Sequence, residues 1–280
     1  MSLKSDRWII GQNRIPAFRF VDRKGDKNYV VGPPYTEYES QVIKASLYDI
    51  EGIGGPSPAK HPLRRHIAVQ IPKAQLDDWK PMIEGAVDKP IRYVDRTTGE
   101  PVDVPYGEEP PETARKIISY GTSSYGYDVR IKGDPEQIKV FTNVYEPEID
   151  PKNMKESNFG TPQVQIAADG SRFVWVPAHG YIQAPTMEYF RIPRDVLVIV
   201  LGKSTYARSA LICNVTPIEP EFEGEVVIEV ANVTNSPVRC YLEEGIAQFV
   251  FLQGDEACLR SYKDKMGKYQ GQRGLTLARV

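Results

Sequence analysis

Short apolar runs separated by glycine and proline fill the chain from Ile117 to Leu252, and this pattern limits the fold more than any other feature. The runs lie at 118–130, 173–176, 189–201, 211–215, 226–230, 238–241 and 246–252. Hardly any stretch between them has the amphipathic period of a long helix. Short strands joined by frequent turns are typical of sandwiches, jelly rolls and barrels. The sequence therefore predicts a mainly β fold with a few short helices.

One run, Val196–Leu201, ends at a glycine and leads into the basic stretch Gly202–Arg208. The uninterrupted apolar run predicts a strand that is buried on both faces. Hydroxyl residues suited to a helix start follow it, together with a lysine and an arginine, so the stretch suits an anion such as phosphate. A plain strand-to-helix corner with solvated basic side chains has the same composition. A Walker A P-loop is excluded, because that motif needs a glycine where Leu197 stands.

Composition excludes several classes of function. The 280 residues carry a formal net charge of −2, with 41% hydrophobic and 26% charged residues, as in ordinary globular proteins of one or two domains. A chain with this net charge lacks the excess of positive charge that general nucleic-acid binding requires. We expect no membrane span and no signal peptide, because no long apolar run is present. The widely spaced cysteines indicate reduced packing residues, so a cytoplasmic location is expected.

The domain organisation is predicted from a change in amino-acid composition along the chain. Residues 11–115 are rich in proline, glycine and charge, and we expect an insertion or accessory region of unknown role there. An N-terminal helix is expected at 1–10, and the β core at 116–260. The basic, glycine-bearing residues 261–280 predict a mobile tail that orders on an anion, although a frayed terminus looks the same.

The histidines and cysteines form no metal-binding pattern. The sequence holds no Cys-x-x-Cys pair and no His-x-Glu element, so the zinc deaminase signature is missing and no metal ligands are predicted. No Gly-x-Ser-x-Gly nucleophile elbow is present, although the spacing of the residues does not exclude a serine nucleophile activated by a histidine. Hydrolytic chemistry is therefore expected to use a carboxylate and a water molecule.

The carboxylate that draws attention is Glu229, within the apolar stretch 225–230. Strand alternation places Val226, Ile228 and Val230 on one face and Glu229 on the other. The pattern alone makes Glu229 a solvent-facing residue. A functional role requires that face to be covered, for example by a second subunit, so that burial raises the pKa of the carboxyl into the range of a general base.

Several segments, taken together and in order, resemble the dCTP deaminase family of the dUTPase-like superfamily. They lie at 118–130, 189–193, 201–208, 214–228, 245–254 and 262–272. The resemblance covers Met1–Trp8 and nearly all of Ile117–Val280, and it implies a dUTPase-like β-barrel or jelly-roll core. About a hundred residues, near 11–115, have no counterpart in it.

The resemblance implies metal-independent hydrolytic deamination of dCTP to dUTP and ammonia, a step that supplies dUTP for pyrimidine deoxyribonucleotide synthesis. Glu229 falls on the family's catalytic glutamate, which takes a proton from the attacking water and returns it to the departing amine. Ser204 and Arg208 would act beside it.

The resemblance also implies a set of ligands and partners. Nucleotide contacts are expected from Lys203, Ser204, Thr205, Tyr206, Ala207, Arg208, Val227, Ile228, Glu229, Gln248, Tyr262, Lys268 and Gln272. No cofactor is needed for the chemistry, and Mg²⁺ is expected on the substrate's triphosphate. A homotrimer with sites between subunits is expected, and dTTP is a possible inhibitor.

Two alternatives remain. One is a bifunctional enzyme that also releases pyrophosphate from dUTP. That activity needs an aspartate in the turn before the glutamate strand and an aromatic that stacks on uracil; Glu219 and Phe222 occupy this region, and the aspartate-bearing Ile-Asp pattern is missing. The other is a catalytically silent nucleotide-binding regulator. The sequence also departs from the family at Ser209-Ala210, where a glycine usually stands second, and this change could shift the loop.

Overall fold

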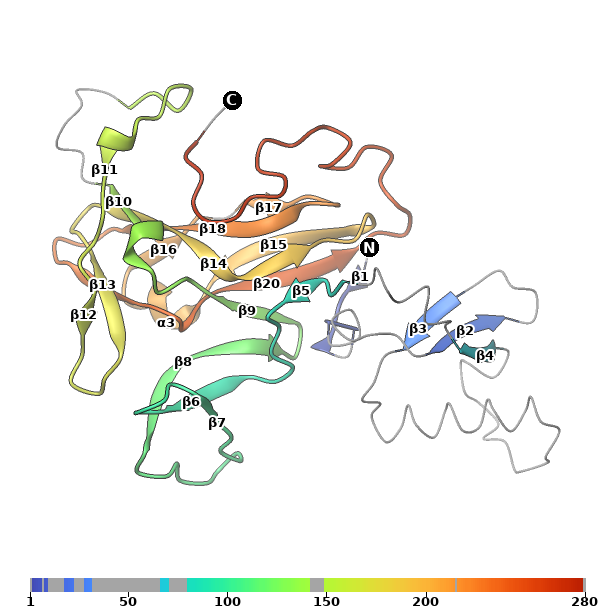
Figure 1. The fold of residues 1–280 in the computed structure, drawn as a ribbon, viewed down its shortest axis with the longest axis horizontal. Helices are drawn as coiled ribbons and strands as arrows, with labels where there is room; N and C mark the ends of the chain where they lie inside the picture. The colour runs from blue at the N-terminus through green and yellow to red at the C-terminus, as the bar shows by residue number, and fades with distance from the viewer. Residues whose placement is uncertain are drawn as a thin grey trace. The chain divides into compact units, whose positions relative to one another are not determined.

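The computed structural model divides into two units, one of residues 1–9 and 82–280 and the other of residues 10–81 (Figure 1). It describes residues 2–6, 8–9, 18–22, 28–31, 66–70, 80–141, 149–214 and 216–278. Within the 10–81 unit, β2 (Phe18–Asp22) pairs with β3 (Asn28–Val31) and β4 (His66–Gln70), both antiparallel.

The first sheet of the other unit runs in the order β17-β15-β20-β9-β8-β6-β7, and β1 pairs with β20 beside this path. Its strands are β1 (Ser2–Leu3), β6 (Ile91–Asp95), β7 (Pro101–Val102), β8 (Ala114–Ser123), β9 (Gly126–Arg130), β15 (Val196–Gly202), β17 (Pro217–Ile218) and β20 (Gly245–Gln253). All of these pairings are antiparallel.

A second sheet runs in the order β11-β10-β14-β18-β16, with β5 beside β14, and a short third sheet runs β12-β13-β19. Their strands are β5 (Ile83–Glu84), β10 (Lys139–Phe141), β11 (Phe159–Gly160), β12 (Gln165–Ile166), β13 (Arg172–Val176), β14 (Tyr181–Arg191), β16 (Leu211–Cys213), β18 (Glu223–Asn232) and β19 (Val238–Tyr241). Short helical segments include η2 (Pro135–Gln137), η3 (Glu156–Asn158) and α3 (Ser204–Ala207). The prediction of a mainly β fold with short helices is confirmed.

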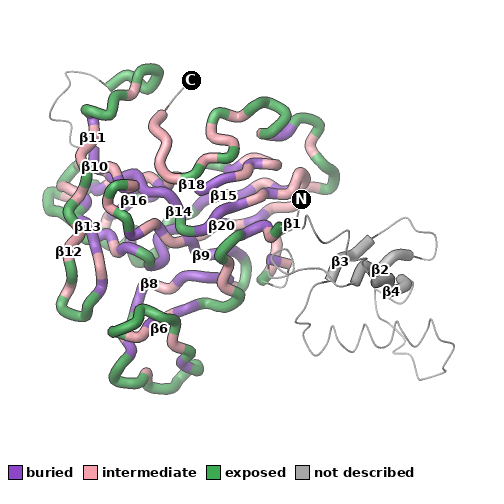
Figure 2. The backbone as a smooth tube through the Cα atoms, viewed as in Figure 1, coloured by how far each residue is buried: buried purple, intermediate pink, exposed green. Residues whose placement is uncertain are grey.

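The hydrophobic core lies between the first and second sheets. The rings of Phe190 on β14 and Phe249 on β20 lie 4.8 Å apart, and both side chains are fully buried. Buried residues of β9, β15 and β18 join the same cluster, which Figure 2 shows as purple stretches along these strands. The two sheets therefore pack face to face, as in a sandwich.

The prediction that Val196–Leu201 is buried on both faces is wrong. Val196, Val198 and Val200 are buried, whereas Leu201 is 43% exposed. The strand β15 pairs antiparallel with β17 and β20, and the second sheet covers one of its faces. Antiparallel sheets commonly leave their other face open, so a continuous apolar run does not prove burial on both sides.

The C-terminal part of the predicted insertion differs from the rest of it. Residues 82–115, which the composition groups with the insertion, belong to the same unit as the β core. Here β5 pairs with β14 and β6 pairs with β8. Backbone pairing with β8 and β14 places these residues in the same unit as the β core. Proline and glycine content carries no information about such pairing.

The N-terminus begins as a strand and then forms a helical turn. Ser2 and Leu3 pair with Gln253 and Leu252 as β1, whereas the expected helix covered 1–10. A helical turn follows, in which the Ile9 amide donates to the Ser5 carbonyl at 3.1 Å. None of the helices formed by the described residues has the length and hydropathy to cross a membrane.

Candidate active site

Glu229 lies near the middle of β18, between β14 and β16. It stands directly opposite Gln183 of β14, and its carbonyl accepts a hydrogen bond from the Asn214 amide at 2.9 Å. The alternation is as predicted, because Ile228 and Val230 are buried in the core on the other face. The side chain of Glu229 therefore projects from the face of the second sheet that points away from the core.

This face already buries Glu229 in part within one chain. Glu229 is half-buried, and this burial raises the pKa of its carboxyl above the usual value. Negative charge on Glu229 contributes to raising the pKa of Tyr181 and of Cys213, the latter to about 11, although burial is the larger cause for both. A carboxyl with a raised pKa beside non-acidic neighbours is suited to accept and return a proton.

The stretch Gly202–Arg208 forms the end of β15 and the helix α3. Lys203 is the N-cap of α3, and its Nζ lies 2.5 Å from Oδ2 of Asp128 and 3.3 Å from Oγ of Ser119. Both partners are on neighbouring strands, β8 and β9. Lys203 is therefore held by the protein itself, and its charge is shared with Asp128.

Tyr206 anchors α3 from within. Its side chain is 2% exposed, and its hydroxyl accepts a hydrogen bond from the Tyr241 amide at 2.9 Å. The predicted nucleotide contact at Tyr206 can therefore come from its backbone only. Ser204, Thr205, Ala207 and Arg208 are exposed around it. Within the described parts of the chain, no acidic group pairs with the Arg208 guanidinium.

Gln248 of β20 lies beside the start of this loop. It pairs with Leu201 on one side and with Asp128 on the other. Its Nε2 donates to Oγ of Ser123 at 3.0 Å. The structure thus gathers Lys203, Gln248 and Asp128 at the same end of the first sheet. Asp128 was not identified from the sequence as a partner of Lys203. Strand alternation within 126–130 was the one sequence pattern that bears on the direction of its side chain.

Cys213 lies between this loop and Glu229. It is opposite Val230 in the β16–β18 pairing, and a Cβ atom built on Gly202 would lie 3.4 Å from its Cβ. The loop and the glutamate strand are therefore near neighbours across β16. Within the described part of the chain, the Glu229 carboxylate makes no hydrogen bond to Ser204 or Arg208.

The predicted tail residues pack against the start of β18. The Gln272 Nε2 donates to the Glu225 carbonyl at 2.6 Å, and the Glu225 amide donates to the Gln272 carbonyl at 3.0 Å. Tyr262 stacks edge-on against Phe222, with ring centroids 5.6 Å apart, while Lys268 is exposed. Figure 1 shows this tail, in red, beside β17 and β18.

The expectation that residues 261–280 order on an anion stays a prediction, and in this structure the tail is attached to its own chain. The reason is backbone pairing, because Gln272 forms a bridge with Gly224 where β18 begins. Glu229 is four residue steps beyond Glu225 along β18, a distance of about 13 Å in an extended strand. Three residues lie between them: Val227 is half-buried on the face of Glu229, whereas Val226 and Ile228 are in the core.

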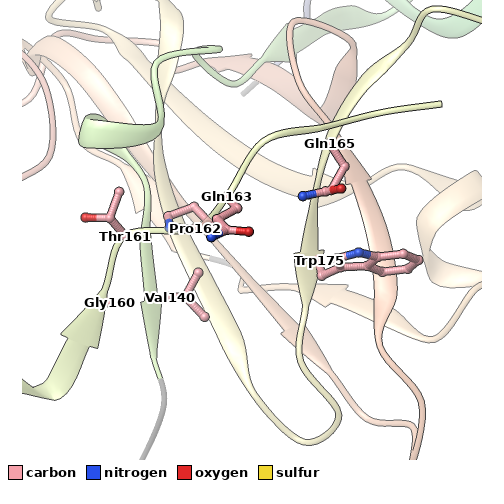
Figure 3. A pocket seen from close by; sticks show the side chains of 7 residues that line it. All are labelled: Val140, Gly160, Thr161, Pro162, Gln163, Gln165 and Trp175. Atoms are coloured by element: carbon pink, nitrogen blue, oxygen red, sulfur yellow. The ribbon is translucent and has the colours of Figure 1, made fainter.

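A pocket of about 250 Å³ lies elsewhere, between β10, β12 and β13 (Figure 3). It is lined by Val140, Gly160, Thr161, Pro162, Gln163, Gln165 and Trp175. None of the predicted site residues lines it. The described residues also contain no group of three or more histidine, cysteine or acidic side chains placed to hold a metal ion.

Comparisons with known proteins identify the family of the chain. The dCTP deaminase-like family model matches residues 112–254. The chain is 55% identical over 165 residues to a dCTP deaminase of Pseudomonas aeruginosa strain UCBPP-PA14, covering 59% of this chain and 82% of that protein. It is 49% identical over 193 residues to a dCTP deaminase of Acidovorax sp. strain JS42, covering 69% of this chain and 97% of that protein.

Among solved structures, the 2′-deoxycytidine 5′-triphosphate deaminase of Agrobacterium tumefaciens is similar with a TM-score of 0.35 and 15% identity, over 48% of this chain and 39% of that one. The segment that matches the family model, residues 112–254, includes β18 with Glu229 and the loop with Ser204 and Arg208. The chain belongs to the dCTP deaminase family.

Proposed function

We propose that this protein deaminates dCTP by hydrolysis and releases dUTP and ammonia. The observation that carries the proposal is Glu229, a half-buried carboxyl with a raised pKa within the segment that matches the family model. The 49–55% identity to proteins named dCTP deaminase supports the choice of substrate.

In the proposed reaction, Glu229 first acts as a general base and then as a general acid. The ionised carboxylate takes a proton from water as the oxygen adds to C4 of cytosine. The carboxyl then gives that proton to the 4-amino group, the C4–N bond breaks, and ammonia leaves. The balance is dCTP and water to dUTP and ammonia. The reaction written in this way needs no metal ion at the reacting carbon.

We assign the surrounding residues by their position. Arg208, exposed and without an acidic partner among the described residues, would bind negative charge on the nucleotide, and Ser204 lies one helical turn before it. The backbone of α3, together with Lys203 and Gln248, would form one wall of the nucleotide site. Tyr262, Lys268 and Gln272 would act from the tail. Mg²⁺ would accompany the triphosphate as part of the substrate.

A site shared between subunits accounts for two features of the single chain. Among the residues that the structure describes, the Glu229 carboxylate is not hydrogen-bonded to Ser204 or Arg208. Apolar side chains are exposed on the elements around them, with Leu201 at 43% and Ile212 at 51%. We therefore propose a homotrimer in which a neighbouring chain covers Glu229. Inhibition by dTTP and a cytoplasmic location stay predictions.

The structure gives no support to additional pyrophosphate release. Glu219 is paired with Lys265 of the tail, and Phe222 is 7% exposed and packs against Tyr262. Neither side chain is free to replace the aspartate or the stacking aromatic that this activity needs. We therefore favour deamination alone.

One assay distinguishes the candidates. The purified full-length protein is incubated with dCTP and Mg²⁺, and the nucleotides and ammonia are quantified. Equal amounts of dUTP and ammonia support the proposal. Formation of dUMP and pyrophosphate would show the bifunctional enzyme, and unchanged dCTP with measurable binding would show a silent regulator.

A further inference from the structure

Gln183 is a buried amide beside Glu229. It lies in β14, is 8% exposed, and stands directly opposite Glu229 in the antiparallel pairing with β18. Side chains at such opposed positions project from the same face, with Cβ atoms roughly 4.5–5.5 Å apart. Sequence reasoning did not identify Gln183, because the pairing joins residues 46 positions apart.

The amide of Gln183 is satisfied on one side only. Its Nε2 donates to the Tyr181 hydroxyl at 3.2 Å. Its Oε1 is buried and has no hydrogen-bond partner within the described part of the chain. A buried carbonyl oxygen without a donor is costly, and it calls for a functional explanation when it lies beside a catalytic group.

The groups around Gln183 and Glu229 limit which donor can serve this oxygen. On the same face, β14 contributes Tyr181, whose hydroxyl receives the Nε2 hydrogen bond. The strand β10 contributes Lys139, opposite Gln183, and its Nζ lies 3.3 Å from Oε2 of Glu156. Cys213 of β16 is opposite Val230 and lies in the core, so its thiol is on the other face of the sheet. Glu229 is the neighbour that becomes a new O–H donor when the reaction transfers a proton to it.

We propose that Gln183 is a positioning residue for Glu229, and that its Oε1 accepts a hydrogen bond from the Glu229 carboxyl once that carboxyl holds the proton taken from water. This inference rests on the proposed function, in which Glu229 takes a proton from the attacking water; the same protonated carboxyl also forms in the free enzyme at low pH. The hydrogen bond stabilises the protonated carboxyl and fixes its orientation until the proton passes to the departing amine.

This role predicts opposite effects of two substitutions. Gln183→Met keeps the length of the side chain and removes the acceptor oxygen. The protonated form of Glu229 loses its partner, so we expect kcat to fall about tenfold and the acidic limb of the kcat/KM profile to move to lower pH. Gln183→Glu adds a second carboxyl that competes for the proton, so the acidic limb moves to higher pH.

Stability separates positioning from a purely structural role. Gln183→Met removes the unpaired buried oxygen, which favours the fold, and also the Nε2 hydrogen bond to Tyr181, which opposes this gain, so we expect the midpoint of thermal unfolding to stay close to that of the wild type. Gln253→Met is the matched control. The Gln253 Nε2 donates a hydrogen bond to Oδ2 of Asp195 at 2.5 Å. Gln253 lies on β20 in the first sheet, whereas Glu229 lies on β18 in the second. We expect this control to lower the unfolding midpoint and to keep the wild-type pH profile.

The experiment measures the pH dependence of dCTP turnover and the unfolding midpoint for the full-length wild type and these three variants. Opposite shifts for Gln183→Met and Gln183→Glu support the inference. If the wild type turns over dCTP and both Gln183 variants keep its kcat and pH profile, the positioning role is refuted and the proposed function stands. If the wild type releases no ammonia from dCTP, the proposed function fails and the inference fails with it.

Discussion

Glu229→Gln tests the centre of the proposed chemistry. The substitution keeps the size of the side chain and removes its ability to take a proton from water. Removal of a general acid–base group typically costs 10²–10⁴-fold in rate, or about 2.7–5.4 kcal/mol of activation free energy. We expect kcat for dCTP to fall within that range while KM changes little, because the loss concerns the transition state.

The same substitution should change the free energy of unfolding in a direction that depends on pH. Burial raises the pKa of Glu229 in the folded chain, so the folded state holds this proton more tightly than the unfolded state does. The carboxyl is protonated in both states below the unfolded pKa. Above the folded pKa the wild type carries a partly buried anion. The stability advantage of Glu229→Gln over the wild type should therefore grow as pH rises through this window.

Ammonia release and urea unfolding at pH 4 and pH 7.5 measure the two effects. Glu136→Gln is a suitable control, because Glu136 is an exposed carboxylate in η2. The control should turn over dCTP like the wild type. Turnover by Glu229→Gln within threefold of the wild-type rate would refute the assignment of Glu229, and a lower unfolding free energy at pH 7.5 would refute the account of its burial.

Three further substitutions test the loop and the scaffold. Glu188 is fully buried, with its Oε1 2.9 Å from Nε of Arg130; Glu188→Ala leaves that arginine unpaired and should lower the free energy of unfolding by about 3–5 kcal/mol in urea titrations. Arg208→Met should leave this free energy within about 0.5 kcal/mol of the wild type, yet lower kcat/KM for dCTP at least about tenfold in steady-state assays. Gly121 has φ +101°, and an added Cβ would lie 2.4 Å from the Lys89 carbonyl oxygen; Gly121→Ala should lower the thermal midpoint, and an unchanged melt would contradict this backbone constraint.

Local patterns in the sequence were sufficient to predict the β class and the face of Glu229. The alternation in β18 depends only on neighbouring residues, and the structure follows it at Ile228 and Val230. Features that depend on pairing between distant strands could not be predicted. These include the open face of β15, the assignment of residues 82–115 to the core, and the contact of the tail with Glu225.

The candidate site shows the same division. Lys203, Arg208 and Glu229 follow from the resemblance to a family, because a motif is read residue by residue. Gln183 has no motif, and its position opposite Glu229 depends on the register between two strands. Polar residues outside any motif therefore become candidates only when the register of the sheet is known.

The buried ring of Tyr206 divides the loop into two kinds of position. One side chain of α3 belongs to the interior, and its neighbours Ser204, Thr205, Ala207 and Arg208 face outward. Mutational tolerance should follow this division. A saturation library selected only for folded protein should keep Tyr206 and randomise the rest, so the ligand preference of this loop can diverge without a matching change in the core.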